Sequence, residues 1–462
     1  MDAGFWAALT LGLGLCVQAL LRERPRWGLM PAALAALGWL SLLPASTPTR
    51  EGSGPDLLLL TLDTLRADQL QPDRTPRLLA FAERARRYDN AVSTAPLTAP
   101  AHASMLTGLS SPEHGLTANG DRVEAASVVS ALKEAGYATA AFLSSKVLDR
   151  GTGLNEGFQL YADAWTWRAR QGAMPGVAAL LGGGRGERRG DHTVEQALSW
   201  WQATEGPRMA WVHLYDAHAP YAPPKEWMPD EATRLRVQSQ VQSTAAPEGL
   251  GDWMHSLPER HAAGQRALYE AEVRWTDELA GRLLEGVGPD TVVLVLADHG
   301  EGFGEHGDSF VHGGNLFEPV MRVPLLVRWP GALSPGRSDE LVSVRAVAGT
   351  LASAASVSWP TPGLGQEDRV LAFTPGQQSR AGPRDQEPEL LASVRRADSK
   401  LILGSTTPAS HFALDSDPAE LSPGAPSDAP PEDLSELRTL MAAPPEPLGS
   451  EAQRRLEALG YF

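Results

Sequence analysis

Five short, strongly apolar runs recur along the chain, at 56–61, 137–143, 209–215, 291–297 and 323–328. Runs of this length and composition predict buried strands of a parallel sheet. Helical patterns lie between them, for example at 75–87, 194–201 and 268–284. This alternation predicts an α/β fold with a large, mainly parallel central sheet and helices on both faces.

The chain has 462 residues, enough for one large or two ordinary domains. A segment rich in Pro, Gly and Ser at 47–55 is interpreted as a linker. We expect a main α/β domain at 56–360 and a smaller C-terminal subdomain and tail at 361–462. Polar loops are expected at 181–191, 238–251 and 374–388, and a short terminal helix at 450–459.

Two apolar runs precede the linker, at 4–21 and 27–45, each near the ~20 residues that a membrane span needs. The basic segment 22–26 separates them, so the positive-inside rule places that loop in the cytoplasm. We therefore expect a two-helix membrane hairpin over 1–46, with the following domain facing the periplasm or cell exterior. A signal peptide cleaved near Ala45 is the alternative, and a cytoplasmic protein with buried N-terminal helices a third.

Charge and cysteine content exclude some classes of function. The net charge of −16 provides no basic surplus, which argues against nucleic acid as a partner. Cys16 is the only cysteine, so an intramolecular disulfide is impossible, and cysteine content does not indicate whether the protein resides in an oxidising or a reducing compartment.

Polar residues follow three of the apolar runs at the point where each ends. Asp63 follows the first, Asp216 and His218 follow the third, and Asp298 and His299 follow the fourth. Ligands of open α/β sheets bind outside the carboxyl ends of the strands, so we expect these side chains to converge. Two carboxylates and an imidazole, from Asp63, Asp298 and His299, could hold one divalent ion. Capping of helices and turns is the alternative role for each aspartate.

The stretch "LTAPAHASMLTG" at 97–108 raises a second question. Thr98 precedes a proline and a helix-like run, which is typical of an N-cap. A hydroxyl at a helix N-terminus beside a metal could instead attack an anionic ester, whose oxygens the helix end would hold. The geometry of a helix cap and that of a nucleophile at the helix end are compatible, so Thr98 could serve in both roles.

Ordered blocks from 56 to 462 resemble the sulfatase family of the alkaline phosphatase superfamily. "LDTLRADQL" resembles its first metal motif, "LTAPAHASMLTGLSSPEHG" its nucleophile signature and "ADHGEGFGEHG" its second metal motif. "HLYDAHAPYAPP", "HGGNLFEPVMRVPLLVRWPG", "KLILGSTTPASHFALDSDPAELSP" and "RRLEALGYF" resemble further family blocks. The resemblance implies an enzyme with the sulfatase fold, a smaller C-terminal subdomain and a bound metal ion.

Three positions depart from the family pattern. Thr98 stands where sulfatases carry the Cys or Ser that is oxidised to formylglycine, so no formylglycine is expected. His102 replaces the signature arginine, and Thr64 replaces the usual second acidic metal ligand. With one acid fewer and His299 present, manganese or zinc is favoured over calcium.

The resemblance also implies roles for residues outside the metal set. His312 falls where the family places a side chain on the ester oxygens, and His218 where a His lies near the leaving group. Either could donate a proton there. Lys146 lies close to a family active-site lysine. We expect His102 either to orient Thr98 or to be a surface-facing helical histidine, and Asp216 to orient His218 or to cap a helix.

Three functions fit these residues. The first is a metal-dependent hydrolase of sulfuric or phosphoric esters with Thr98 as nucleophile, His102, His218 and His312 assisting, and Lys146 binding substrate. The second is a phospho-group transferase of the phosphoethanolamine type, which passes the same intermediate to an alcohol. The third is a catalytically degenerate binding domain. The expected partner is a small anionic ester, a glycan or a lipid head group.

Overall fold

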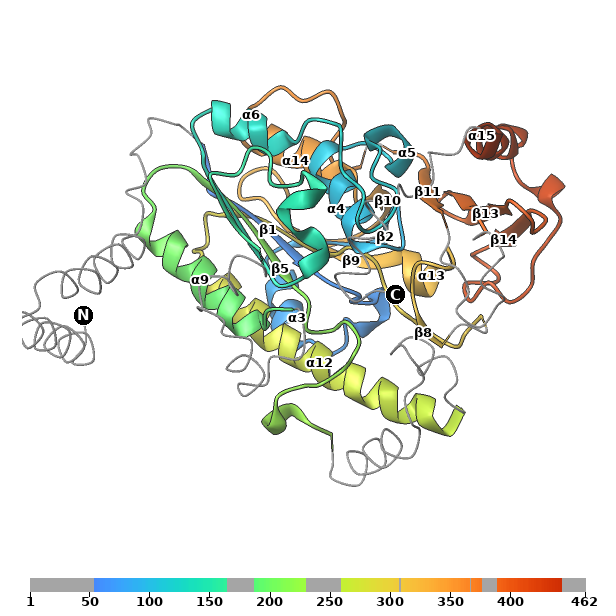
Figure 1. The fold of residues 1–462 in the computed structure, drawn as a ribbon, viewed down its shortest axis with the longest axis horizontal. Coiled ribbons are helices and arrows are strands. Elements are labelled where there is room, and N and C mark those ends of the chain that lie inside the picture. Colours follow the sequence, from blue (N-terminus) through green and yellow to red (C-terminus); the bar gives the residue numbers. More distant parts are fainter. Residues whose placement is uncertain are drawn as a thin grey trace, which may run out of the picture. The chain divides into compact units, whose positions relative to one another are not determined.

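The computed structural model describes residues 54–163, 187–229, 259–306, 309–365, 367–375 and 389–442. Its centre is an eight-stranded sheet with the order β10-β2-β9-β6-β1-β5-β3-β4 (Figure 1). The strands are β1 (Leu57–Leu62), β2 (Arg86–Val92), β3 (Ala138–Leu143), β4 (Leu160–Ala162), β5 (Arg208–Leu214), β6 (Val292–Ala297), β9 (Arg322–Arg328) and β10 (Gly336–Ser343). All five predicted strands are present.

The sheet is mainly parallel, as predicted, but β9 runs against both of its neighbours. It pairs antiparallel with β6 and with β2, whereas the other neighbouring strands pair parallel. The prediction of a parallel strand at 323–328 was therefore wrong in direction. The chain reaches β9 from β6 through the short strands β7 (Gly302–Phe303) and β8 (Ser309–Val311) and the one-turn helix α13 (Glu318–Met321), without the long crossover helix that a parallel return normally uses.

Helices cover both faces of the sheet (Figure 1). One layer contains α3 (Pro76–Ala82), α9 (Gly190–Ala203) and α12 (Glu259–Gly286). The other contains α4 (Thr98–Thr107), α5 (Ser111–His114), α6 (Val128–Glu134) and α14 (Ala346–Ala354). The core consists of the leucines and valines of the central strands; every residue of β1 and of β6 is buried. The predicted helices at 194–201 and 268–284 lie within α9 and α12.

The helix expected over 75–87 is shorter than predicted, because α3 ends at Ala82. Its last two expected residues, Arg86 and Arg87, belong to β2, which pairs with β9 on one side and β10 on the other. Tyr88, Ala91 and Val92 supply the buried positions of that strand. Pairing with two neighbours thus overrides a local sequence pattern that is compatible with a helix.

A separate antiparallel sheet lies in the C-terminal part. It contains β11 (Val370–Thr374), β12 (Leu391–Arg395), β13 (Ser399–Gly404) and β14 (Ser410–Ala413), in that order, and α15 (Pro431–Ala442) packs against it. A buried charge cluster joins this sheet to α13. Lys400 Nζ lies 2.7 Å from Glu318 and 2.9 Å from Glu420, and Arg395 lies 3.4 Å from Glu318.

Several predicted segments fall outside the described residues: the membrane hairpin at 1–46, the loop at 238–251, the helix at 450–459, and most of the linker and of the loops at 181–191 and 374–388. Of the helices that are described, none has both the length and the apolar character that crossing a bilayer requires.

Candidate active site

The carboxyl ends of three adjacent central strands, β6, β1 and β5, lie at one rim of the sheet. Asp63 follows β1, and Asp298 and His299 follow β6, the parallel neighbour of β1. One ligand atom from each residue lies within 4.8 Å of the others, and all three side chains are fully buried. The predicted convergence of these residues is therefore confirmed, and the group has the composition of a metal site.

The hydrogen bonds around this group leave its metal-binding atoms open. His299 Nδ1 donates to the Gly300 carbonyl at 2.9 Å, and this directs Nε2 into the group, 3.6 Å from Asp298 Oδ2 and 4.0 Å from Asp63 Oδ1. Asp298 Oδ1 accepts from two backbone N–H groups, whereas Asp298 Oδ2 and Asp63 Oδ1 have no hydrogen-bond partner. Burial, and then the nearby Asp298, raise the pKa of Asp63. Buried carboxylate oxygens without partners fit a divalent cation, which would satisfy them.

Thr64 does not offer its side chain to the group. Its hydroxyl oxygen lies 2.8 Å from the Asp63 carbonyl and 2.9 Å from the Ala217 carbonyl, and these two acceptors share its single hydrogen. Its backbone has φ +55°, a left-handed conformation that is rare for a β-branched residue. That conformation accompanies a backbone bond from the Thr64 N–H to Asp298 Oδ1 at 3.3 Å. Thr64 therefore helps to orient a carboxylate through its main chain.

Thr98 is the first residue of α4, and its hydroxyl faces the same group. Oγ1 lies 3.4 Å from Asp63 Oδ2 and 3.4 Å from His299 Nε2. The N-cap residue is Leu97, without a side-chain capping bond, so the interpretation of Thr98 as the cap was wrong. The N–H of Ala99 instead donates to Asn119 Oδ1 at 3.0 Å. The hydroxyl is thus placed for chemistry at the rim and caps no helix.

His102 is fully buried, which rules out the surface-facing alternative. Burial, and then His213, lower its pKa to about 3, so the ring is neutral. Nδ1 donates to the Thr98 carbonyl at 2.7 Å, and Nε2 accepts from the Thr61 hydroxyl at 2.9 Å. These bonds hold the first turn of α4 against β1.

Three residues of this network were missed by the sequence analysis: Thr61, Trp211 and His213. Thr61 Oγ1 accepts from Trp211 Nε1 at 3.0 Å and from His213 Nδ1 at 3.0 Å, since its own hydrogen is donated to His102. His213 Nε2 is then bare, 3.3 Å from Asp63 Oδ2 and without a hydrogen-bond partner. The available signal was a polar residue inside each of two apolar runs, and β1 and β5 pair these two directly.

His218 and His312 form a second group of rings beside the first. The His312 ring stacks on His299, with 4.4 Å between centroids, and meets the His218 ring edge-on at 4.9 Å. His218 also stacks on Tyr215 at 4.3 Å. Burial lowers the pKa of His312 to about 4, and burial followed by His312 lowers the pKa of His218 to about 3. The predicted pair is therefore brought together next to the metal-binding group.

Glu301 is a further residue of this part of the site that the sequence analysis did not select. It is fully buried, and its two carboxylate oxygens face different partners. Oε1 lies 3.2 Å from His312 Nδ1, and Oε2 accepts from the Tyr221 hydroxyl at 3.4 Å. Its position two residues after His299 in "DHGE" was the available signal.

The remaining candidates have other placements. Asp216 Oδ1 accepts from the Gly190 N–H (3.3 Å) and from Trp275 Nε1 (3.1 Å). Asp216 therefore caps the start of α9, which was the alternative to orienting His218. Burial raises its pKa to about 6. Lys146 follows β3 at the start of a short 3-10 helix, Lys146–Leu148. Its backbone N–H donates to Glu187 at 2.7 Å. Lys146 as a substrate-binding residue stays a prediction.

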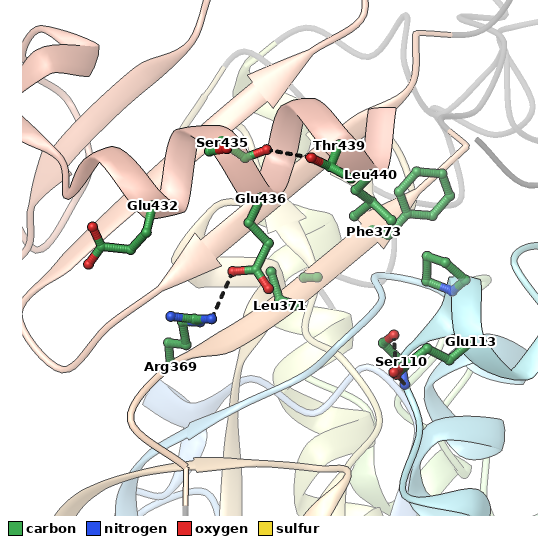
Figure 2. A pocket seen from close by; sticks show the side chains of 12 residues that line it. Ser110, Glu113, Arg369, Leu371, Phe373, Glu432, Ser435, Glu436, Thr439 and Leu440 are labelled. Atoms are coloured by element: carbon green, nitrogen blue, oxygen red, sulfur yellow. Dashed lines mark hydrogen bonds and ion pairs between the residues drawn. The ribbon is translucent and has the colours of Figure 1, made fainter. Parts of the chain in front are cut away.

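A pocket elsewhere in the domain does not contain these residues. Figure 2 shows it between α5, β11 and α15. Arg369 and Glu436, which both line it, form an ion pair with 3.1 Å between them. None of the strand-end acids or histidines lines it. The chemistry described above therefore belongs to the strand-end rim.

Known proteins are similar to this chain over most of its length. Residues 55–357 match the family model described as Sulfatase. Choline-sulfatase of Rhizobium meliloti (strain 1021) is 26% identical over 427 residues, which cover 79% of this chain and 81% of that protein. A structure solved in complex with its substrate D-glucosamine-2-N,6-O-disulfate has a TM-score of 0.64 at 17% identity, with 84% of this chain and 97% of that chain covered. The phosphonate monoester hydrolase of Agrobacterium radiobacter has a TM-score of 0.63 at 18% identity, with 84% and 95% covered.

Proposed function

This chain belongs to the sulfatase family and is a hydrolase of that family, and from this premise we propose that Thr98 is the nucleophile with which it cleaves sulfuric or phosphoric esters. The observation that carries the proposal is the position of the Thr98 hydroxyl, 3.4 Å from both Asp63 Oδ2 and His299 Nε2 at the start of α4. The relatives' names and substrates support an anionic ester, such as a sulfated glycan, as the substrate class.

The residues of the rim divide the reaction between them. Asp63, Asp298 and His299 would hold one divalent ion, for which manganese or zinc suits the donor set better than calcium. Such an ion supplies positive charge that polarises the ester and favours ionised oxygen. Asp63 Oδ2 lies 3.4 Å from the Thr98 hydroxyl and would accept its proton as Oγ1 attacks sulfur or phosphorus. His102 holds Thr98 in place by accepting from Thr61 and donating to the Thr98 carbonyl.

His218 and His312 support departure of the alcohol. Their rings lie against each other, and the His312 ring lies against His299, next to the nucleophile. A proton from one of them to the leaving oxygen would prevent the build-up of negative charge there. Water then attacks the ester formed on Thr98 and releases the inorganic anion.

A transferase is the second candidate, and the side chain of Thr98 is the observation that favours it. A threonine ester can only be resolved by attack at sulfur or phosphorus, and an acceptor alcohol can do this as well as water. The resemblance of a threonine nucleophile to phospho-group enzymes of the superfamily supports this candidate. Product analysis in the presence of glycerol or ethanolamine would separate transfer from hydrolysis.

The proposal also includes the location of the site. The charge pattern of 1–46 supports a membrane hairpin that leaves the catalytic domain in the periplasm or outside the cell. We then expect a reporter enzyme that works only outside the cytoplasm to be active when it is fused after Pro55. A mature protein that begins near residue 46 would instead support the signal-peptide alternative.

The test of the proposed function uses the full chain purified in detergent. Aryl sulfate, phosphate monoester, phosphodiester and phosphonate monoester substrates are each assayed with Mn²⁺, Zn²⁺ and Ca²⁺. We expect turnover of at least one class, lost in Thr98→Ala, and a covalent adduct on Thr98 detectable by mass spectrometry. Absence of turnover with every ester and metal would favour the binding-domain alternative.

A further inference from the structure

We propose that Glu318 is a positioning residue for the metal-binding group, because it ties helix α13 to the C-terminal sheet and α13 fixes the main chain at Gly300, next to His299. The inference rests on the part of the proposed function that places one divalent ion on Asp63, Asp298 and His299. It goes beyond that part, because it says which distant element holds a metal ligand in place. It stands on a continuous series of contacts from one sheet to the other.

The side chain of Glu318 is buried and lies against two cations of the C-terminal sheet. Oε1 lies 2.7 Å from Lys400 Nζ on β13, and Oε2 lies 3.4 Å from Arg395 Nη2 on β12. The Glu318 N–H donates to Glu420 Oε2 at 2.5 Å, and Glu420 Oε1 lies 2.9 Å from the same Lys400 Nζ. Both the main chain and the side chain of the first residue of α13 are thus held by the C-terminal part of the chain.

Apolar contacts hold the rest of α13 in the same place. Val320 and Met321 are fully buried in one cluster with Val370 and Ala372 of β11. The helix therefore lies between β9 of the central sheet and the C-terminal sheet (Figure 1). A helix of one turn is not stable by itself, so its position depends on these surroundings.

The main chain of α13 lies directly against Gly300. The Val320 carbonyl accepts from the Gly300 N–H at 2.7 Å. A Cβ atom at Gly300 would collide with the Pro319 carbonyl oxygen, so no larger residue fits without a shift of α13. The Gly300 carbonyl accepts from His299 Nδ1 at 2.9 Å, which is the bond that directs Nε2 into the metal-binding group. The position of α13 is thus passed through one residue to the ring of His299.

A second contact reaches the main chain of Asp298. The Met321 carbonyl accepts from the Ser93 N–H at 2.8 Å, and Ser93 Oγ lies 2.5 Å from the Asp298 carbonyl oxygen. The segment 298–300 is therefore held by α13 at two points, one direct and one through Ser93. Partners that orient metal ligands commonly contribute about 10–100-fold to metal affinity. A shift of α13 would thus weaken metal binding although all three ligand side chains remain.

The experiment compares Glu318→Gln with Asp433→Asn in the full chain, purified in detergent and freed of metal. Glutamine keeps the size of the Glu318 side chain and removes its charge. Asp433 is the matched control, because it is a buried acid of the C-terminal part whose Oδ1 lies 2.7 Å from Arg396 Nη2, outside the Glu318 cluster. Calorimetric titration with Mn²⁺ or Zn²⁺ measures Kd, and urea unfolding measures stability. We expect Kd to rise about tenfold in Glu318→Gln and to stay unchanged in Asp433→Asn, although both variants lose stability.

Two further variants keep the inference testable if Glu318→Gln does not fold. Lys400→Met removes the cation nearest to Glu318 and leaves α13 itself unchanged, and we expect it to raise Kd as well. In a Gly300→Ala background, where the added Cβ already disturbs the contact with α13, Lys400→Met or Glu318→Gln should add little. An unchanged Kd in the folded variants of Glu318 and Lys400, or an equal rise in Asp433→Asn, would overturn the inference.

Hydrogen exchange tests the same contact without a metal ion. The Val320 carbonyl protects the Gly300 amide, so peptides that cover 298–303 should exchange faster in Glu318→Gln and at the wild-type rate in Asp433→Asn. Unchanged exchange in Glu318→Gln would overturn the inference. If the wild type binds neither ion, the metal part of the proposed function fails, and the exchange rates decide whether Glu318 positions this main chain. A protein that binds the ion and cleaves no ester would contradict the proposed reaction and leave this inference in force.

Discussion

The Thr61 hydroxyl lies 2.9 Å from His102 Nε2, although 41 positions separate the two residues in the chain. The other ring nitrogen of His102 donates to the Thr98 carbonyl at 2.7 Å. One neutral imidazole thus links a polar residue of a buried strand to the residue that begins α4. The placement of Thr98, the proposed nucleophile, depends on a bond between the sheet and the helix that covers it.

Replacement of His102 by alanine should lower both stability and turnover. The Thr98 carbonyl and the Thr61 hydroxyl would lose a buried partner, at a cost of about 1–3 kcal/mol each. Urea unfolding measures the free energy, and we expect kcat to fall more than KM changes, because Thr98 shifts. His192→Ala is the control, since that helical histidine is half exposed. Full activity of His102→Ala would contradict the role assigned to this network.

Replacement of Thr98 by alanine should abolish turnover and leave the fold intact. Loss of a nucleophile costs on the order of 10⁶ in rate in the best-studied hydrolase. Thr98→Ser should keep part of the activity, because it retains the hydroxyl. Thr107→Ala is a matched control at the other end of α4, where the hydroxyl donates to the Ala103 carbonyl. An active Thr98→Ala protein would show that another group attacks the ester.

Divalent metal should stabilise the protein through the Asp63–Asp298–His299 group. A ligand at a hundredfold excess over its Kd adds about 2.7 kcal/mol to the unfolding free energy. We expect Mn²⁺ or Zn²⁺ to raise Tm in the wild type and not in Asp298→Asn. Asp216→Asn should keep the metal response, because that buried carboxylate lies outside the group. A metal response that survives in Asp298→Asn would place the ion elsewhere.

Stability should fall as pH decreases below about 6.5, in part because of His114. Burial lowers its pKa from 6.5 to about 4. The unfolded chain therefore binds a proton between these values that the folded chain does not, so the stabilisation is complete above about pH 6.5 and is lost toward about pH 4. His114 Nδ1 accepts from the Leu116 N–H at 3.1 Å, which protonation would break. His114→Asn should flatten the pH dependence of urea unfolding while activity at neutral pH remains. An unchanged slope would contradict the assignment.

The buried charges that join the C-terminal sheet to α13 should be sensitive to removal of one partner. Although burial alone would raise it, Lys400 and then Arg395 lower the pKa of Glu318 to about 2. Glu318→Ala would leave Arg395 without this carboxylate partner and Lys400 with Glu420 alone, and should cost about 3–5 kcal/mol. Replacing Glu318, Lys400, Arg395 and the buried Glu420 together by apolar residues should recover much of the loss. Thermal unfolding compares the variants, and a neutral Glu318→Ala would show that the cluster does not attach the sheet.

The sequence was sufficient for the features that depend on local pattern. Uninterrupted apolar runs identify strands buried on both faces, and because parallel strands end at one rim, Asp63, Asp298 and His299 could be placed together without coordinates. The direction of β9 could not be predicted in this way, because an apolar run has no orientation. Strand β2 was missed because its charged residues fit a helix as well, and its pairing with distant strands decides between the two.

The environment of single side chains was the least predictable part of the site. An isolated histidine in a helix, such as His102, gives no sign of which face is covered until the neighbouring strands are placed. Glu301 and His213 acquire their roles from partners 11 and 152 positions away. The role of each side chain depends on which of its atoms donate and which accept hydrogen bonds, and these can only be assigned once its partners are known.

The left-handed backbone at Thr64 has a consequence for substitution at this position. Aspartate and asparagine adopt that conformation far more readily than threonine, because their short polar side chains tolerate it. The loop after β1 thus has a shape that suits aspartate or asparagine better than the threonine it carries. A change from threonine to aspartate would therefore reduce strain in the main chain and add a carboxylate next to Asp63.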